Sequence, residues 1–178
     1  MTLQFVGALT RGESAPIIQY VSTITFLISA VLITFANYVW RSIWKKFPFL
    51  NTLFFPDING KWEGVLKSTW RDSDNNLLPP IATTIWIRQT LFSIHVQQRT
   101  NESESWSRHV IYEANFEAGH FQIWYIYSNK PKAQYSHRSS RHDGVAILEI
   151  VPEISVDEIN GNYYTSRNTS GDINIRRT

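Results

Sequence analysis

A run of hydroxyl and amide side chains around one arginine, from Tyr163 to Ile173, is the stretch of this sequence best suited to hold an anion. The guanidinium of Arg167 has hydroxyl side chains before it and Asn168 after it. Its planar fork of N–H donors matches the oxygens of a phosphate. The residues that end at Gly171, Asn-Thr-Ser-Gly, are also typical of a hairpin turn. Without further support, the turn is the preferred interpretation.

Aromatic side chains are the second feature with binding chemistry. Tryptophans and tyrosines fall in segments that are predicted below as strands: Trp62, Trp70, Trp86, Trp106, Trp124, Tyr112, Tyr125, Tyr127, Tyr163 and Tyr164. Nucleobases stack on aromatic rings with about 1–3 kcal/mol per base, so such rings can hold a nucleotide. For each single ring, however, packing in the core or at the rim of a sheet is the preferred interpretation.

Histidines and acids indicate no reaction centre. The segment His137–Asp143 carries two histidines, but their spacing defines no zinc site in a loop, and we interpret it as solvated. His95, His109 and His120 are dispersed, and no nucleophile and base pair is evident. The chain has no cysteine. We therefore expect a protein that is not an enzyme and that holds no metal or cofactor.

The element on which the rest of the chain depends is an apolar segment, Ile17–Val39, within an uncharged run from Ser14 to Trp40. As a helix this segment covers about 34 Å, enough to cross a hydrocarbon core of about 30 Å. It is too long for a signal peptide, and no small-residue cleavage site follows it. A buried core helix is disfavoured because no other long helix is predicted to cover it. We therefore predict a transmembrane helix over residues 17–40.

The flanks of this helix predict its orientation. Aromatic and basic residues follow it: Tyr38, Trp40, Arg41, Trp44, Lys45 and Lys46. Positive charge on this side predicts a single pass through the membrane, with the N-terminus outside and the remainder in the cytoplasm. Residues 1–16 are expected to be a short leader. Residues 41–56 are expected either to lie along the headgroup boundary or to form a linker packed against the next domain.

The remaining residues, 57–178, suffice for one soluble domain. They carry 13 Lys and Arg against 14 Asp and Glu. Binding of DNA or RNA depends on neutralising phosphates, so this balance argues against both as partners. Any anionic ligand requires a local site. The absence of cysteine suits a cytoplasmic domain.

Residues 58–178 contain short β-branched and aromatic segments separated by turn residues. The predicted strands are Asn59–Arg71, Ala82–Gln89, Leu91–Thr100, Glu104–Asn115, His120–Ser128, Gly144–Pro152, Ile159–Arg167 and Gly171–Arg177. Sequential strands with tight turns predict an all-β fold, a compact up-and-down antiparallel barrel of about eight strands and of lipocalin-like type, because closure removes exposed edges. A β-sandwich is the alternative.

Two motifs carry a resemblance to a known family. Asp57-Ile-Asn-Gly60-Lys-Trp62-Glu-Gly64 opens the β-rich domain, and Asn160-Gly-Asn-Tyr-Tyr-Thr-Ser-Arg-Asn-Thr-Ser-Gly-Asp172 closes it. With the preceding span, they resemble the transmembrane β-barrel effectors of bacterial CBASS antiphage systems, the SMODS-associated family with membrane helices and a β-strand-rich domain. The likeness covers essentially the whole chain. That family has two membrane helices, whereas this sequence shows one clear crossing.

The resemblance implies a barrel that binds a cyclic dinucleotide made by a partner nucleotidyltransferase during phage infection. It also implies that the liganded protein self-associates and disrupts the inner membrane, which kills the cell. On a nearly neutral barrel such a ligand needs charge and stacking rings, for which the candidates are Arg167, Arg88, Tyr164, Trp62, Thr165, Asn168 and Thr169. The alternatives are a membrane-tethered barrel for a lipid or other apolar ligand and a structural protein with a filled barrel.

Overall fold

The structure, a computed structural model, describes residues 14–137, 139–152 and 155–178. The chain divides into two compact units between Ser42 and Ile43. Each unit is described by itself.

One continuous helical stretch begins in the first unit. It consists of α2 (Ser14–Thr34), a π-helical turn η1 (Phe35–Val39) and α3 (Trp40–Lys46). From Ile17 to Lys46 it spans 30 residues and is, within the described part of the chain, the one helix long and apolar enough to cross a membrane. It runs past the predicted end at residue 40 because no helix breaker occurs before Pro48. The predicted leader lies outside the described residues except for residues 14–16.

The segment that follows belongs to the second unit and contains one short helix, α4 (Leu50–Leu53). The Trp44 ring packs against Phe55 with centroids 5.2 Å apart, and its indole N–H donates to the Phe55 carbonyl oxygen over 2.8 Å. Phe55 in turn packs against the core of the barrel. Four other apolar side chains of this segment are exposed: Phe47, Phe49, Leu53 and Phe54.

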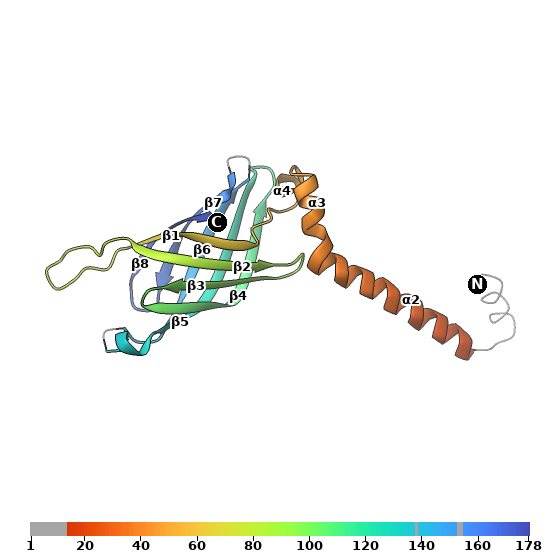
Figure 1. Ribbon diagram of the computed structural model, residues 1–178, viewed down its shortest axis with the longest axis horizontal. Helices are drawn as coiled ribbons and strands as arrows, with labels where there is room; N and C mark the ends of the chain where they lie inside the picture. The colour runs from red at the N-terminus through yellow and green to blue at the C-terminus, as the bar shows by residue number, and fades with distance from the viewer. Residues whose placement is uncertain (1–13, 138, 153–154) are drawn as a thin grey trace. The chain divides into compact units, whose positions relative to one another are not determined.

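Eight antiparallel strands close into a barrel in the order of the sequence, so that β8 pairs with β1 (Figure 1). They are β1 (Gly60–Ser68), β2 (Ile81–Gln89), β3 (Ile94–Thr100), β4 (Ser103–Asn115), β5 (His120–Pro131), β6 (His142–Val151), β7 (Ser155–Thr165) and β8 (Ser170–Arg177). The predicted up-and-down barrel is therefore confirmed, and the β-sandwich is wrong.

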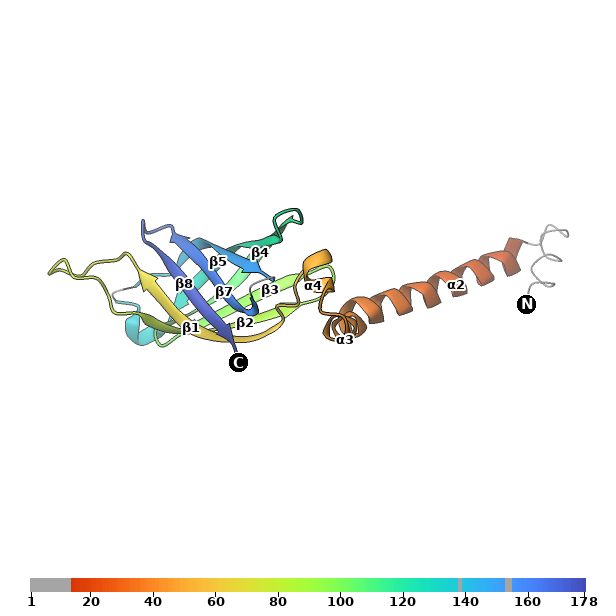
Figure 2. The ribbon, with the colours of Figure 1, turned by 90° about the horizontal axis from the view of Figure 1, so that it is seen from above.

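The barrel has two ends that differ in their connections. We call the end at which β1 begins the proximal end; it follows α4 and carries the turns at residues 90–93 and 116–119 (Figure 2). We call the opposite end the distal end. It carries the connections at residues 69–80, 101–102, 132–141 and 166–169.

All eight predicted strands exist, and the differences lie at their ends. β1 ends at Ser68, so Trp70, which was predicted on a strand, lies beyond it. β6 begins at His142, so the last part of the segment interpreted as a solvated loop belongs to a strand.

The interior of the barrel is a hydrophobic core through its proximal and middle parts. Inward side chains come from every second position, as in Phe121, Ile123, Tyr125 and Tyr127 of β5, whose exposure is between 0% and 6%. The other core members are Ile58, Trp62, Leu66, Ile85, Ile87, Val96, Ala146, Leu148, Ile150, Ile159, Ile173 and Ile175. Burial of each large aliphatic or aromatic side chain contributes about 1.5–3 kcal/mol, which drives closure.

The chain entering β1 closes the proximal end. The Ile58 N–H donates to Gln89 Oε1 over 2.8 Å, and the Trp62 indole N–H donates to the Ile58 carbonyl oxygen over 3.0 Å. The Arg177 guanidinium lies 4.7 Å from the centroid of the Trp62 ring and donates to the Asp57 carbonyl oxygen. These contacts join the end of β8 to the chain that enters β1. They leave Trp62 fully buried.

Candidate functional site

The interior of the barrel becomes polar toward the distal end. Thr83 and Ser105 occupy inward positions there and are buried. The Gln98 side-chain amide donates to Thr83 Oγ1 over 3.0 Å, and the Asn129 amide donates to Ser103 Oγ over 3.0 Å. Buried polar groups need such partners. The distal end is therefore the end with chemistry suited to a polar ligand.

Two tyrosines extend this polar region, and each faces a glycine. A Cβ atom at Gly144 would collide with the Tyr127 hydroxyl, and one at Gly171 would lie 2.7 Å from the Tyr163 ring. Desolvation by burial is the main cause that raises the pKa of Tyr127 to about 12, and it also raises the pKa of Tyr163. A hydrogen bond with Ser68 opposes part of this rise in the Tyr163 pKa. Both tyrosines are therefore neutral hydrogen-bonding groups at neutral pH.

A pocket of about 500 Å³ lies on the outer side of the barrel near the distal end, on β4, β5 and the residue before β6. We call it the distal basic pocket; it is lined by Trp106, Ser107, Arg108, Ser128, Lys130 and Arg141. The indole of Trp106 is 41% exposed. Cationic side chains around an exposed aromatic ring supply both phosphate contacts and a stacking surface. The volume is within the range of about 300–1,000 Å³ that is usual for small-ligand sites.

A β-bulge places Arg108 in this pocket. The register between β4 and β5 shifts between Ser107 and His109, so the intervening residue has no direct cross-strand partner. Arg108 Nε donates to Ser128 Oγ over 2.6 Å, and the Ser128 hydroxyl donates to the Asp143 carboxylate. Because Asp143 accepts from Ser128, this chain of contacts holds the guanidinium against β5.

Arg167 lies at the same end, in the turn between β7 and β8. Arg167 Nη1 donates to Ser139 Oγ over 3.0 Å, which joins this turn to the connection that ends at Arg141. Desolvation is the largest cause that lowers the pKa of His142, and the charge of Arg167 lowers it further. The Ser140 carbonyl and Asp143 act in the opposite direction. Arg167, His142 and Arg141 therefore gather around the start of β6.

The other predicted binding residues of this segment also lie together. Thr165 and Thr169 share a hydrogen bond of 2.6 Å between their hydroxyl oxygens, and Asn168 closes the turn at a φ of 58°. Tyr164 points outward and is 52% exposed. The hairpin turn is thus confirmed, while a role for these residues in binding stays a prediction.

The remaining two predicted residues are not brought to this site. Trp62 is fully buried at the proximal end beneath Arg177, so neither face of its ring is accessible to a base. Arg88 lies on β2 opposite His95, also toward the proximal end. Their residue types suit binding, but the strand register separates both of them from Arg167.

Sequence analysis missed the cations of the distal basic pocket. Arg108 is far in the sequence from Lys130 and Arg141, and the pairing of β4 with β5 brings it near them. One signal was available, since basic residues are frequent between Lys130 and Arg141. The bulge that directs Arg108 has no comparable signature.

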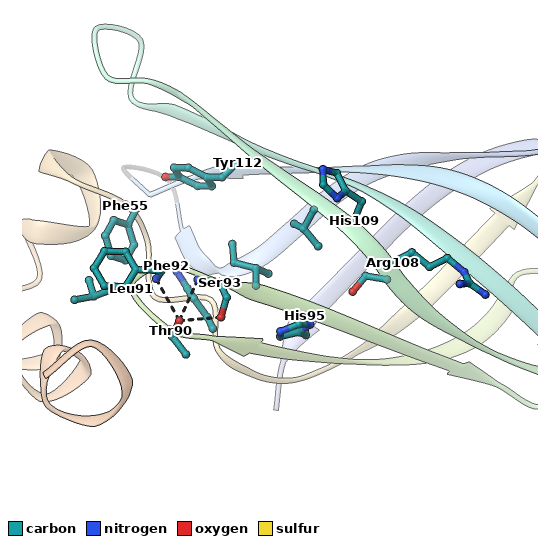
Figure 3. A pocket seen from close by; sticks show the side chains of 13 residues that line it. Phe55, Thr90, Leu91, Phe92, Ser93, His95, Arg108, His109 and Tyr112 are labelled. Atoms are coloured by element: carbon teal, nitrogen blue, oxygen red, sulfur yellow. Dashed lines mark hydrogen bonds between the residues drawn. The ribbon is translucent and has the colours of Figure 1, made fainter. Parts of the chain in front are cut away.

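A second pocket, of about 320 Å³, lies toward the proximal end, where β3 and β4 separate (Figure 3). These strands pair only from Gln97↔Trp106 to Arg99↔Glu104, and the Val96 N–H donates to the Ser107 hydroxyl oxygen over 3.0 Å. We call this pocket the proximal groove. Phe55 and Phe92 lie at one end of it, and His109 and Arg108 lie toward the other. The rest of the lining combines the apolar and aromatic side chains of Leu91, Ile94, Val110 and Tyr112 with polar ones from Gln89, Thr90, Ser93, His95 and Ser107.

Comparison with known proteins identifies relatives of the barrel. Residues 53–177, which contain all eight strands, match the family described as Cap15, cyclic dinucleotide receptor domain. The chain is also similar to CD-NTase-associated protein 15 of Escherichia albertii, with 23% identity over 181 residues that cover 98% of this chain and 85% of the relative. The family is described by the ligand that it receives, which indicates a sensor or effector.

Proposed function

The chain belongs to the family of Cap15 cyclic dinucleotide receptor domains, and from this premise we propose that it is the membrane-anchored effector of a CBASS antiphage system. The barrel binds a cyclic dinucleotide supplied by a cognate nucleotidyltransferase. Binding promotes self-association, which disrupts the bacterial inner membrane and kills the infected cell. The chain acts by binding, without a catalytic step. Family membership confirms the resemblance to CBASS effectors, and the observation that carries the binding site is the distal basic pocket.

The ligand has two phosphodiesters and two bases, so it requires at least two cationic contacts and a stacking surface. In the proposed complex, Lys130 and Arg141 contact the phosphates while a base stacks on Trp106. Arg108 adds charge from the wall of the pocket. Arg167, from the β7–β8 turn, and Tyr164, near the end of β7, hold the part of the ligand that extends beyond the pocket. A hydrogen bond to a charged group contributes about 1.5–3 kcal/mol, so two such contacts dominate affinity on a nearly neutral domain.

The membrane part of the proposal is supported by the apolar helix Ile17–Lys46. The basic residues at its C-terminal end support an orientation with the barrel in the cytoplasm, where the nucleotide is made. Anchoring to one surface raises the local concentration of barrels and so favours self-association. A switch from about 1% to about 99% assembled requires the ligand to prefer the assembled state by about 5.5 kcal/mol.

Calorimetry on the full-length protein in detergent tests the site. We expect a double variant, Lys130→Ala with Arg141→Ala, to bind its cyclic dinucleotide at least about 100-fold more weakly, since two charge-assisted contacts are lost. Arg88→Ala is the matched control because Arg88 is an exposed arginine away from the pocket, and its affinity should stay within about twofold of wild type. Unchanged affinity in the double variant would remove the ligand from this pocket.

Dye release from liposomes tests the membrane mechanism. The full-length protein should release an entrapped dye when cyclic dinucleotide is added, and the double variant should not. Residues 43–178, the compact second unit, should bind ligand without causing release. Release by that fragment would refute a mechanism that needs the helix.

The proximal groove supports one alternative function, in which the barrel binds a lipid or other apolar ligand. Its lining by Phe55, Ile94 and Val110 is the specific observation. In that case a fatty acid, and no cyclic dinucleotide, should raise the melting temperature of the wild type. Val110→Trp, which fills the groove, should abolish the shift.

A further inference from the structure

The proximal end of the barrel exposes apolar side chains on three separate segments. Phe92 is 87% exposed in the β2–β3 turn, and Phe116 is 58% exposed after β4. The segment before β1 exposes Phe47, Phe49, Leu53 and Phe54. We call these six side chains the proximal rim. The two turns and α4 lie at the same end of the barrel in both views (Figure 1, Figure 2).

Two of the three segments of this rim carry no acidic side chain. The turn at residues 90–93, Thr-Leu-Phe-Ser, is uncharged, and the segment before β1 carries Lys45 and Lys46 without an acid up to Phe55. The turn after β4 carries one acid, Glu117, beside Phe116. The distal connections carry acids and bases, among them Asp72, Asp74, Arg141 and Arg167. Exposed aromatic side chains with adjacent lysines, as in the segment before β1, suit the headgroup region of an anionic bilayer.

The covalent connection identifies the bilayer as the occupant of this surface. The helix Ile17–Lys46 is about 45 Å long at 1.5 Å per residue, close to the ~40–45 Å of a bilayer with its headgroups. If it spans the membrane, Lys46 lies at the headgroup surface. Residues 47–55 extend at most ~30 Å, whatever the angle between helix and barrel. The proximal rim is therefore always within reach of the lipid.

We propose that the proximal rim docks on the bilayer, with Phe92 and Phe116 inserted at the boundary between headgroups and acyl chains. The inference rests on the membrane anchor of the proposed function and adds to it a second contact, made by the barrel itself. Docking directs the proximal end toward the lipid. The distal basic pocket, at the opposite end, then faces the aqueous phase from which the nucleotide arrives.

The absence of cysteine from the chain permits a clean test by single-cysteine labelling. The full-length protein is reconstituted in liposomes of phosphatidylethanolamine and phosphatidylglycerol. An environment-sensitive fluorophore is attached at Phe92→Cys or Phe116→Cys, and at Leu77→Cys as the matched control. The exposed fraction of Leu77, 55%, is similar to the 58% of Phe116, but Leu77 lies at the distal end. Leu32→Cys, within the helix, reports on the anchor.

We expect labels at positions 92 and 116 to shift to shorter emission wavelength and to be quenched by spin-labelled lipid, while the label at position 77 does neither. A quenched label at position 32 with unquenched labels at 92 and 116 would overturn rim docking and leave the anchor intact. An unquenched label at position 32 would overturn the anchor and the docking that rests on it. A blue shift at 92 and 116 that grows with protein density but without lipid quenching would identify a second copy as the occupant and overturn the proposal.

Discussion

Removing the hydroxyl of Tyr125 should stabilise the barrel. The side chain lies in the hydrophobic core, is 2% exposed, and its hydroxyl forms no hydrogen bond with any described residue. Burial raises its pKa, with a further contribution from Tyr127, so the group stays neutral. A buried polar group without a partner costs about 1–3 kcal/mol.

Tyr125→Phe recovers that cost and loses only the packing contacts of one oxygen atom. We therefore expect a net gain of about 1–2 kcal/mol in the free energy of unfolding. For a domain of this size, a gain of that order raises the melting temperature by roughly 3–7 °C. Tyr163→Phe is the matched control, because the Tyr163 hydroxyl is paired with Ser68. Loss of this hydrogen bond should lower the free energy of unfolding by about 0.5–1.5 kcal/mol.

Urea unfolding of residues 43–178, followed by tryptophan fluorescence, measures both variants. The signs should be opposite, with Tyr125→Phe shifted to higher urea and Tyr163→Phe to lower urea. A lower midpoint for Tyr125→Phe would show that its hydroxyl has a partner in solution, and would refute the assignment of an unpaired group in the core.

Two further predictions concern the distal end. Since the pKa of His142 is lowered in the folded state, the unliganded barrel should lose stability as the pH falls below about 6.5, the ordinary histidine value. An anionic ligand favours the imidazolium, so affinity should rise between pH of about 7.5 and about 5.5, and His142→Gln should flatten both profiles in calorimetry and urea unfolding. Gly144→Ala should destabilise the barrel by about 1–3 kcal/mol, because its Cβ would collide with the Tyr127 side chain and with the Tyr164 carbonyl oxygen. Tyr127→Phe should recover part of this loss in a double-mutant cycle, and strictly additive effects would contradict the contact.

The fold was predictable because its signals are local. The alternation from Phe121 to Tyr127 marks the inward face of β5 directly, and turn residues separate all eight strands. Strand ends were less predictable, as at Trp70, since side-chain type does not show where pairing stops. The gap between β3 and β4 depends on the register of both strands, which no single segment specifies.

The site was predictable only in part. Arg167 was predicted as a binding residue because its neighbours in the sequence also form the turn, and its role in binding stays a prediction. The distal basic pocket was not found, because pairing between β4 and β5 and a bulge at Arg108 bring its cations together. Trp62, a predicted stacking ring, is fully buried, and its spacing to Leu66 matches the inward face of β1. Residue type identifies what can bind, whereas burial decides what is accessible.

The most direct test of the central claim is an equilibrium-dialysis titration of the full-length protein with labelled cyclic dinucleotides. We expect saturable binding of at least one of them, which weakens when Lys130 and Arg141 are both replaced by alanine and survives Arg88→Ala. Saturable binding that is insensitive to the distal basic pocket, or no saturable binding of any cyclic dinucleotide, would contradict the account.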